Sequence, residues 1–402
     1  MRVCRICGKG DFKEVISFGE APLVNSLIEK TDLDKKEPTW PLVVEQCQSC
    51  FLVQIVEPVS AEKIYRDVDY LYFSGDMPGL KDYFREYAED VRTRFLHERH
   101  FVLEIGSNDG TMLDCFRPAQ RVLGVDPASN TVVRALKNGI PTLSDFFSER
   151  IAKSIKRDFG QANVIYGNNC IAHSSDLHDL MKGVKTLLAE NAVFIVECNY
   201  WGGMVKNKNY SLIYHDHFSY FTLQSWKDIA SMYGLRVFDA WVTPAQGGSL
   251  RVFLTNGSHG STDRMRVLES EEEKTKLNSY ETAIKYSQDV QREAWRLGAL
   301  VKKLKKEGAK IAGYGAAAKG FSILQLAGIT DEIDYFVDDS PAKQGKYTPI
   351  THIPVISRAD AETKLPDYFF ITAPNYAKVI MEKEKAFKNA GGQFILSDSM
   401  IV

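Results

Sequence analysis

Four side chains that can exchange protons stand next to one another near the middle of the chain. Tyr214, His215, Asp216 and His217 are consecutive, and aromatic residues flank them on both sides. Histidine titrates near neutral pH, so an imidazole here could take a proton from a substrate or return one. A neighbouring carboxylate could fix the tautomer of that imidazole or raise its basicity. The segment therefore predicts general acid–base chemistry.

Two other interpretations of these histidines stay open. If the segment is extended, His215 and His217 point to the same side and could bind a metal ion, although the pattern offers no clear third ligand. Both could also be plain core or surface histidines. His173 has the same ambiguity, because it follows a predicted strand and could be either a site residue or a satisfied structural histidine.

The elements that must position these residues alternate between strands and helices. Strands are expected at Phe101–Ile105, Val122–Val125, Asn163–Gly167, Ala192–Glu197 and Leu250–Thr255. Helices are expected near residues 110–118, 129–138, 175–189 and 223–233, with no helix between 197 and 223. This alternation predicts an α/β domain, a parallel sheet with helices on both faces and its ligands at the carboxyl edge.

The first of these strands runs into a glycine-containing loop, E-x-G-x-N-x-G. Its members are Glu104, Gly106, Asn108 and Gly110, and Asp126 closes the next strand sixteen residues after Gly110. Glycines let the backbone approach a ligand closely, and a carboxylate at the second strand can accept hydrogen bonds from ribose. A dinucleotide loop would be G-x-G-x-x-G instead, so the sequence favours a different cofactor. A strand–turn–helix without any ligand also stays open.

Two C-x-x-C pairs stand near the N-terminus, Cys4/Cys7 and Cys47/Cys50. Four thiolates with no spare ligand position predict a closed, structural Zn²⁺ site. A redox pair or free thiols are the alternatives.

A second nucleotide-like unit follows long charged helical segments expected between about 265 and 307. Gly313 and Gly315 begin a G-x-G-x-x-A match after a predicted strand, with Lys319 at the start of the next helix and Asp338 at the end of the next strand. Further strands are expected near 353–356, 367–373 and 393–397. Taken alone, this unit favours NAD. Lys319 equally suits a diphosphate, and a ligand-free packing turn is the third option.

Composition excludes several classes of function. The formal net charge of −2 gives no electrostatic case for nucleic acid or an anionic membrane. No apolar run approaches the roughly 18 residues of a membrane span, and the N-terminus lacks the apolar core of a signal peptide. We therefore expect a cytoplasmic protein, with three parts at residues 1–70, 71–260 and 261–402.

The loop of Glu104–Gly110 resembles the S-adenosylmethionine loop of class I methyltransferases. That resemblance implies that Asp126 holds the adenosyl ribose, that Asp145 and Phe146 surround adenine, and that Asn168 lies near the methionine end. Nearly the whole chain resembles the nucleotide-diphospho-4-keto-sugar C-3-methyltransferases. The resemblance rests on the four cysteines, the turns Pro22–Ser26 and Tyr72–Gly75, the loop, His173, Tyr214–His217 and Gly247–Arg251.

This resemblance implies a class I methyltransferase sheet flanked by an N-terminal zinc module and a C-terminal Rossmann-like domain. It implies S-adenosylmethionine as the cofactor and a TDP- or GDP-linked 4-keto-6-deoxysugar as the substrate. It makes His217 the base with Tyr214 and Asp216 as partners, although many relatives have Glu at the position of Asp216. It places His173 and Tyr72 in the sugar pocket as further catalytic residues, either of which, like Tyr214, could donate to the developing oxyanion. The implied substrate-binding residues are Ser74, Ser249, Arg251, Gly313, Gly315 and Lys319. We expect a monomer, with an NAD-dependent sugar-nucleotide oxidoreductase and a non-catalytic zinc-bearing binding protein as the rival functions.

Overall fold

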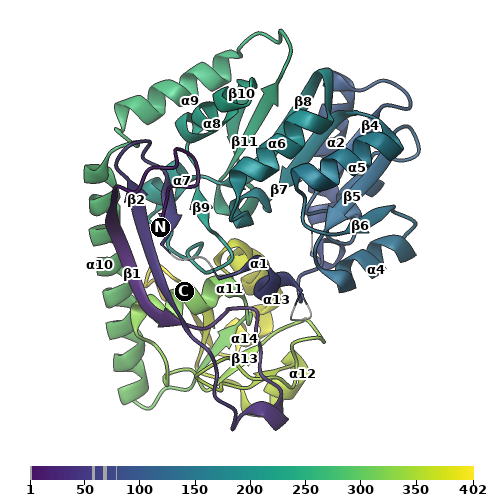
Figure 1. The fold of residues 1–402 in the computed structure, drawn as a ribbon. Helices are drawn as coiled ribbons and strands as arrows, with labels where there is room; N and C mark the ends of the chain where they lie inside the picture. The colour runs from purple at the N-terminus through teal and green to yellow at the C-terminus, as the bar shows by residue number, and fades with distance from the viewer. Residues whose placement is uncertain (1, 57–58, 67–69, 78) are drawn as a thin grey trace.

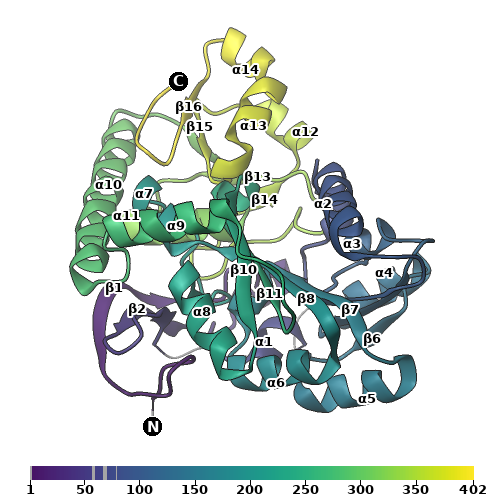
Figure 2. The ribbon, with the colours of Figure 1, turned by 90° about the horizontal axis from the view of Figure 1, so that it is seen from above.

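The computed structural model describes residues 2–56, 59–66, 70–77 and 79–402, so small parts of the region predicted as 1–70 lie outside the described residues. The described chain forms a four-stranded, a seven-stranded and a five-stranded sheet (Figures 1 and 2). Within these residues, no helix combines the length and the apolar character needed to cross a membrane.

The seven-stranded sheet forms the centre of the molecule. Its strands are β4 (Phe101–Ile105), β5 (Arg121–Asp126), β6 (Thr142–Ser144), β7 (Ala162–Asn168), β8 (Leu188–Asn199), β10 (Arg236–Thr243) and β11 (Ser249–Thr255). Their order is β10-β11-β8-β7-β4-β5-β6. β4 to β8 are parallel, whereas β11 is antiparallel to both of its neighbours. The predicted central strands are therefore confirmed, but the wholly parallel sheet is wrong, because a short hairpin connection joins β10 to β11.

Helices cover both faces of this sheet. They are α2 (Leu80–Phe95), α3 (Thr111–Asp114), α4 (Ser129–Lys137), α5 (Glu149–Phe159), α6 (Leu177–Leu187), α7 (Trp201–Asn207), α8 (Leu223–Met232) and α9 (Asp263–Lys274). Strand β4 is buried along its whole length, with Leu103 in one apolar cluster and Val102 in another. This burial on both faces explains its continuous apolar sequence. The expectation of no helix between 197 and 223 is wrong, since α7 occupies part of that stretch.

The four-stranded sheet belongs mainly to the N-terminal region. Strands β1 (Phe12–Ala21), β2 (Trp40–Cys47) and β3 (Val53–Ile55) are joined at the edge by β9 (Ser219–Tyr220), and α1 (Ala61–Tyr65) follows β3 in the chain. Val53 pairs with Tyr220 and Gln54 with Ser219. The segment that contains the predicted acid–base residues therefore continues directly into the sheet of the N-terminal module.

The C-terminal sheet is parallel throughout, in the order β14-β13-β12-β15-β16. Its strands are β12 (Ile311–Tyr314), β13 (Tyr335–Val337), β14 (Val355–Ile356), β15 (Tyr368–Ile371) and β16 (Gln393–Ile395), and its helices are α11 (Ala318–Ala327), α12 (Arg358–Ala361), α13 (Ala377–Lys383) and α14 (Lys385–Asn389). The long helix α10 (Tyr280–Lys306) precedes it and packs against β1, α7 and α11 (Figure 1). It therefore contacts a strand of the N-terminal sheet and helices that belong to the central and C-terminal regions.

Candidate active site

A cavity of about 1030 Å³ lies where the carboxyl edge of the central sheet meets the N-terminal module and the C-terminal sheet. Most of the predicted site residues line it. They are Tyr72, Ser74, Glu104, Gly106, Asn108, Asp126, Phe146, Asn168, His173, Tyr214, Asp216, His217, Gly315 and Lys319. Residues far apart in the sequence thus share one enclosure large enough for a cofactor and a substrate.

Five of the predicted residues do not line this cavity. Gly110 and Gly313 are packing glycines, because an added Cβ would lie 2.8 Å from Ile140 and 2.3 Å from Phe336, respectively. Asp145 forms ion pairs with Arg66 and Arg150 instead. Ser249 and Arg251 are buried within the sheet, where Ser249 Oγ donates to the Ala245 carbonyl and Arg251 pairs with Glu197. Their contacts are structural in this conformation.

The end of β4 presents an acceptor that the protein leaves without a partner. Glu104 is buried, and its Oε2 has no hydrogen-bond partner among the described residues. Burial, together with Asp126 and Asp109, raises the pKa of Glu104 well above its usual value. The side chain of Asn168, at the end of β7, also has both amide atoms unpartnered within the described chain. A buried polar atom without a partner costs free energy, so these groups fit a polar ligand such as the amino-acid end of S-adenosylmethionine.

Asp126 is held in place by the cofactor loop and by the start of α4. Its carboxylate accepts hydrogen bonds from Asn108 N at 2.8 Å, Ala128 N at 2.9 Å and Thr131 Oγ1 at 2.8 Å. A carboxylate has about four acceptor positions, so roughly one remains, on Oδ2. Asp126 can therefore accept from one ribose hydroxyl, which is consistent with the predicted role.

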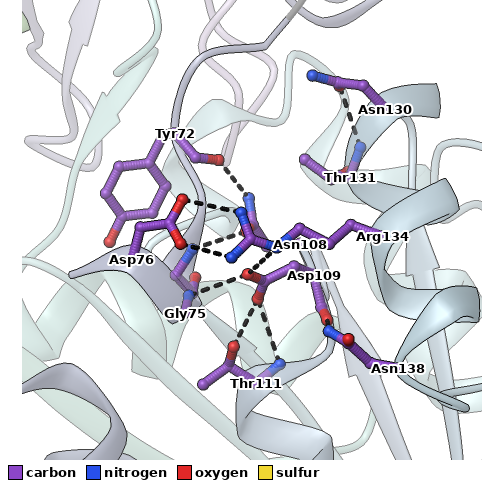
Figure 3. Close-up of polar contacts among 11 residues, drawn as sticks. Tyr72, Gly75, Asp76, Asn108, Asp109, Thr111, Asn130, Thr131, Arg134 and Asn138 are labelled. Carbon is purple, nitrogen blue, oxygen red and sulfur yellow. Dashed lines mark hydrogen bonds and ion pairs between the residues drawn. The ribbon is translucent and has the colours of Figure 1, made fainter. Parts of the chain in front are cut away.

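The side chain of Asn108 has a different partner from the predicted cofactor. It holds the segment Tyr72–Asp76, which we call the strap (Figure 3). Asn108 Oδ1 accepts from Ser74 N at 2.9 Å, and Asn108 Nδ2 donates to the Tyr72 carbonyl at 3.0 Å. Both amide atoms are thus engaged by the strap.

Asp109 and Arg134 add to this attachment of the strap. Asp109 Oδ2 accepts from Gly75 N at 3.0 Å, and the Arg134 guanidinium forms two hydrogen bonds with the Asp76 carboxylate (Figure 3). Neither Asp109 nor Arg134 was predicted. The cofactor loop therefore fixes the backbone from the Tyr72 carbonyl to Gly75 N.

The residues Tyr214–His217 form a turn, not an extended segment. His217 N donates to the Tyr214 carbonyl at 3.0 Å, so Tyr214, Asp216 and His217 all line the same cavity. His215 faces away and packs against Trp40 at a ring-centroid distance of 6.3 Å. The interpretation of His215 and His217 as paired metal ligands is therefore wrong, because it required an extended backbone.

The His217 imidazole is neutral, and its tautomer is fixed by a backbone carbonyl. Nδ1 lies 2.6 Å from the Leu212 carbonyl and 2.9 Å from the side-chain amide of Asn199. The carbonyl can only accept and makes the shorter contact, so Nδ1 bears the proton. Burial and the neighbouring His173 lower the pKa of His217 well below its usual value. Nε2 therefore keeps a free electron pair on the cavity side. Asp216 does not fix this tautomer, contrary to the sequence-based expectation.

Asp216 instead accepts from another part of the chain. Asn25 Nδ2 donates to Asp216 Oδ2 at 3.1 Å, and burial raises the pKa of Asp216 to about 7. Asn25 belongs to the Pro22–Ser26 turn and lines the cavity. The turn that the sequence left without a local role therefore reaches the candidate active site.

His173 lies beside His217, with a ring-centroid distance of 5.1 Å and an interplanar angle of 30°. Burial lowers the pKa of His173 to about 4, so this imidazole is neutral as well. Its Nδ1 lies 2.6 Å from the Tyr65 hydroxyl, and its Nε2 has no partner among the described residues. Tyr214 stacks close to His217 at 4.1 Å between ring centroids. The cavity thus contains two neutral imidazoles and a phenol in mutual contact.

The C-terminal sheet contributes Gly315 and Lys319 to the same cavity. Lys319 Nζ donates to Gln246 Oε1 at 2.7 Å, and Gln246 lies in the connection between β10 and β11. Burial lowers the pKa of Lys319 to about 7. An anionic ligand beside Lys319 would raise this pKa again, because it favours the charged form of the amine.

The four N-terminal cysteines are arranged as a metal site. The sulfurs of Cys4 and Cys50 lie 3.4 Å apart, those of Cys7 and Cys47 lie 3.5 Å apart, and all four lie within 4.8 Å of one another. Tetrahedral zinc with Zn–S bonds of about 2.3 Å needs sulfurs roughly 3.8 Å apart, so the set fits Zn²⁺. Arg5, between Cys4 and Cys7, donates to the Phe218 carbonyl at 2.8 Å. The turn that carries Cys4 and Cys7 therefore contacts Phe218, the residue after His217.

Comparisons with known families cover almost the whole chain. Residues 4–65 match a family described as "Putative zinc binding domain", residues 80–240 match "Methyltransferase domain", and residues 244–397 match "C-methyltransferase C-terminal domain". The chain is 34% identical over 398 residues to C-methyltransferase NovU of Streptomyces niveus, a similarity that covers 98% of this chain and 94% of NovU.

Solved structures of other methyltransferases resemble a little under half of the chain. One is an S-adenosylmethionine-dependent methyltransferase from Clostridium acetobutylicum, with a TM-score of 0.35 and 11% identity over 46% of this chain and 94% of the other. Another is magnesium protoporphyrin IX methyltransferase from Synechocystis with bound SAH, with a TM-score of 0.35 and 10% identity over 44% of this chain and 82% of the other.

Proposed function

Because this chain belongs to the NovU-like family of C-methyltransferases, we propose that it methylates C-3 of a nucleotide-diphospho-4-keto-6-deoxysugar. The family establishes an S-adenosylmethionine-dependent C-methyltransferase with a class I methyltransferase core and a four-cysteine zinc site. The sugar, the carbon atom and the roles of individual residues form the proposal. It is supported most by one observation, the two neutral imidazoles that face the cavity beside the cofactor loop.

Carbon methylation requires a carbanion equivalent, and a ketone at C-4 makes the hydrogen on C-3 acidic. His217 is placed to remove that hydrogen, since its Nε2 has a free electron pair and its Nδ1–H is held by the Leu212 carbonyl. A neutral base with a fixed tautomer needs no proton rearrangement before it acts. The product of this step is an enediolate with negative charge at the C-4 oxygen.

That oxygen needs a hydrogen-bond donor as its charge develops. His173, Tyr214 and Tyr72 all line the cavity. Burial raises the pKa of both tyrosines above the usual value, so both keep their protons and can donate. Donors fixed before the reaction stabilise the transition state without the cost of reorganising water.

S-adenosylmethionine supplies the electrophilic methyl group, and Glu104, Asn168 and Asp126 would hold it. The attacking carbon and the methyl group must be aligned closely for transfer. The strap contributes to that alignment, because Asn108 links the cofactor loop to the backbone around Tyr72.

Gly315 and Lys319 would bind the nucleotide diphosphate from the side of the C-terminal sheet. Lys319 stands in the first turn of α11, where the helix dipole also favours an anion. The zinc ion takes no part in the proton or methyl transfer, since its four thiolates fill a tetrahedral site.

The experiment is methyl transfer from labelled S-adenosylmethionine to a panel of TDP- and GDP-linked 4-keto-6-deoxyhexoses. We expect label in at least one sugar, none with the corresponding 4-hydroxy sugars, and a rise in melting temperature with S-adenosylmethionine but not with NAD. Transfer to none of the 4-keto sugars would count against the proposal. Stabilisation by NAD together with reduction of a keto sugar would favour the oxidoreductase alternative.

A further inference from the structure

We propose that the zinc-binding module takes part in catalysis through Tyr65, which fixes the proton of His173 on the nitrogen that faces the substrate. Tyr65 is a positioning residue in this proposal, since it acts through His173. The catalytic role given to His173 rests on the proposed function. The tautomer of His173 does not, because it can be measured in the protein without substrate.

Tyr65 is the last residue of α1 and lies within the part of the chain that matches the zinc-binding family. Its hydroxyl lies 2.6 Å from His173 Nδ1, and the two rings are nearly parallel, at 12° and 6.0 Å between centroids. Tyr65 is buried, and α1 begins with a Ser60 side chain that accepts from Lys63 N. The phenol is therefore held in place by its own helix.

The direction of this hydrogen bond follows from counting protons. Tyr65 keeps its proton, because burial raises its pKa well above the usual value, and the neutral His173 ring has one N–H. If His173 donated from Nδ1, the buried Tyr65 O–H would have no other acceptor among the side chains and carbonyls that the structure describes. If Tyr65 donates to Nδ1, its proton is used, the ring proton lies on Nε2, and only that Nε2–H lacks a partner within the described residues. The first arrangement leaves two groups unpartnered, the Tyr65 O–H and the Nε2 electron pair, so the second is favoured.

This assignment gives the two stacked imidazoles opposite roles. The Leu212 carbonyl places the His217 proton on Nδ1 and leaves Nε2 as an acceptor, whereas Tyr65 places the His173 proton on Nε2 as a donor. His173 Nε2 has no partner in the described part of the protein, as expected for a donor that awaits a ligand oxygen. One ring can accept the C-3 proton while the other donates to the C-4 oxygen.

Other contacts show that the module is joined to this region at several points. Asn25 donates to Asp216, Arg5 donates to the Phe218 carbonyl, and β3 pairs with β9. Tyr65 and Asn25 therefore both line the cavity, and both belong to the module that contains the zinc site. Loss of the metal would disturb these partners together.

The tautomer can be read without any substrate. We would record two-dimensional ¹⁵N–¹H spectra of the zinc-loaded protein with ¹⁵N-labelled histidine, and assign the His173 signals by their loss in His173→Gln. We expect the Nε2–H tautomer for His173 at pH 7, and partial conversion to Nδ1–H in Tyr65→Phe. An Nδ1–H tautomer in the wild-type protein would overturn the proposal.

Kinetics test the consequence of this hydrogen bond. Tyr65→Phe keeps the ring and its packing but removes the donor, and we expect kcat to fall roughly tenfold with an unchanged Kd for S-adenosylmethionine. Tyr335→Phe is the matched control, because Tyr335 donates to the Lys364 carbonyl at the same distance of 2.6 Å but does not line the cavity. Equal activity of Tyr65→Phe and wild type would overturn the role assigned to Tyr65.

The two measurements separate this inference from the proposed function. If no sugar is methylated by the wild-type enzyme but His173 is the Nε2–H tautomer and changes in Tyr65→Phe, the proposed substrate is wrong and the positioning by Tyr65 is upheld. If sugars are methylated at C-3 but the tautomer is Nδ1–H, only the inference about Tyr65 fails.

Discussion

Replacing Asn108 by Asp tests whether the cofactor loop positions the substrate as well as the cofactor. The two side chains have nearly the same shape, and both tolerate the left-handed backbone at this position, where φ is +49°. The acceptor bond from Ser74 N survives the change. The donor bond to the Tyr72 carbonyl is lost, and a carboxylate oxygen then lies about 3.0 Å from that carbonyl oxygen.

The size of the effect follows from these contacts. A hydrogen bond contributes about 1 kcal/mol net, and a buried carbonyl left facing an acceptor costs a further 1 to 3 kcal/mol or so. The attachment of the strap should therefore weaken by about 2 to 4 kcal/mol. If all of this free energy is lost from transition-state stabilisation, kcat/KM falls roughly 30- to 1000-fold. The backbone N–H of Asn108 still bonds Asp126, so cofactor affinity should change little.

The assay measures kcat and KM for the sugar, and Kd for S-adenosylmethionine by calorimetry. We expect kcat/KM for the sugar to fall at least 30-fold while Kd for the cofactor stays within about threefold of wild type. Asn138→Asp is the control for added charge, since among the described residues the Asn138 side chain makes only a 3.4 Å contact with the Asp109 carbonyl. If cofactor affinity falls by the same factor as kcat/KM, the side chain of Asn108 serves the cofactor and the reasoning is refuted.

Three further predictions follow from the same geometry. His217→Asn should lower the rate of C-3 deuterium exchange in D₂O by roughly 100-fold or more, and exchange at the wild-type rate would show that His217 is not the base. Removal of zinc by a chelator should lower the melting temperature and abolish methyl transfer, because β9 and Phe218 depend on the module; full activity in metal-free protein would contradict this. Burial raises the pKa of Asp216 to about 7, so the folded state binds this proton more tightly than the unfolded chain, and stability should fall by up to about 4 kcal/mol as pH rises from about 4 to 7. Asp216→Asn should remove that part of the pH dependence in urea unfolding, and an unchanged slope would contradict the assignment.

The strands could be predicted because buried parallel strands are continuous apolar runs. β4 and β5 match their predicted positions within a residue at each end. α7 was missed because its sequence, WGGMVKN, contains two glycines, which disfavour a helix in isolation. In the protein, Trp201 and Met204 are buried, and this tertiary packing overrides the weak propensity.

The candidate site was predicted in part. His217, Asp216 and the cofactor loop came from residue types and spacing together with the family resemblance, and they line one cavity. The orientation of His215 was wrong because a turn and an extended segment place neighbouring side chains differently. The Leu212 carbonyl could not be foreseen, since every residue has a carbonyl and only the fold selects one.

The contacts that the N-terminal module makes with the site residues could not be predicted from the sequence either. Tyr65 and Asn25 contact residues more than a hundred positions away, at His173 and Asp216. No local pattern encodes such a pairing. The Pro22–Ser26 segment was predicted as an extended turn between the two cysteine pairs, and neither that pattern nor the family resemblance gave it a partner.

The central claim is that a methyl group becomes bonded to C-3 of a 4-keto sugar. The most direct test is transfer from S-adenosylmethionine with a ¹³C-labelled methyl group, followed by NMR of the purified nucleotide sugar. We predict a labelled methyl group attached to a C-3 that bears no hydrogen and is adjacent to the C-4 carbonyl. A methyl group on oxygen or on any other carbon would contradict the account.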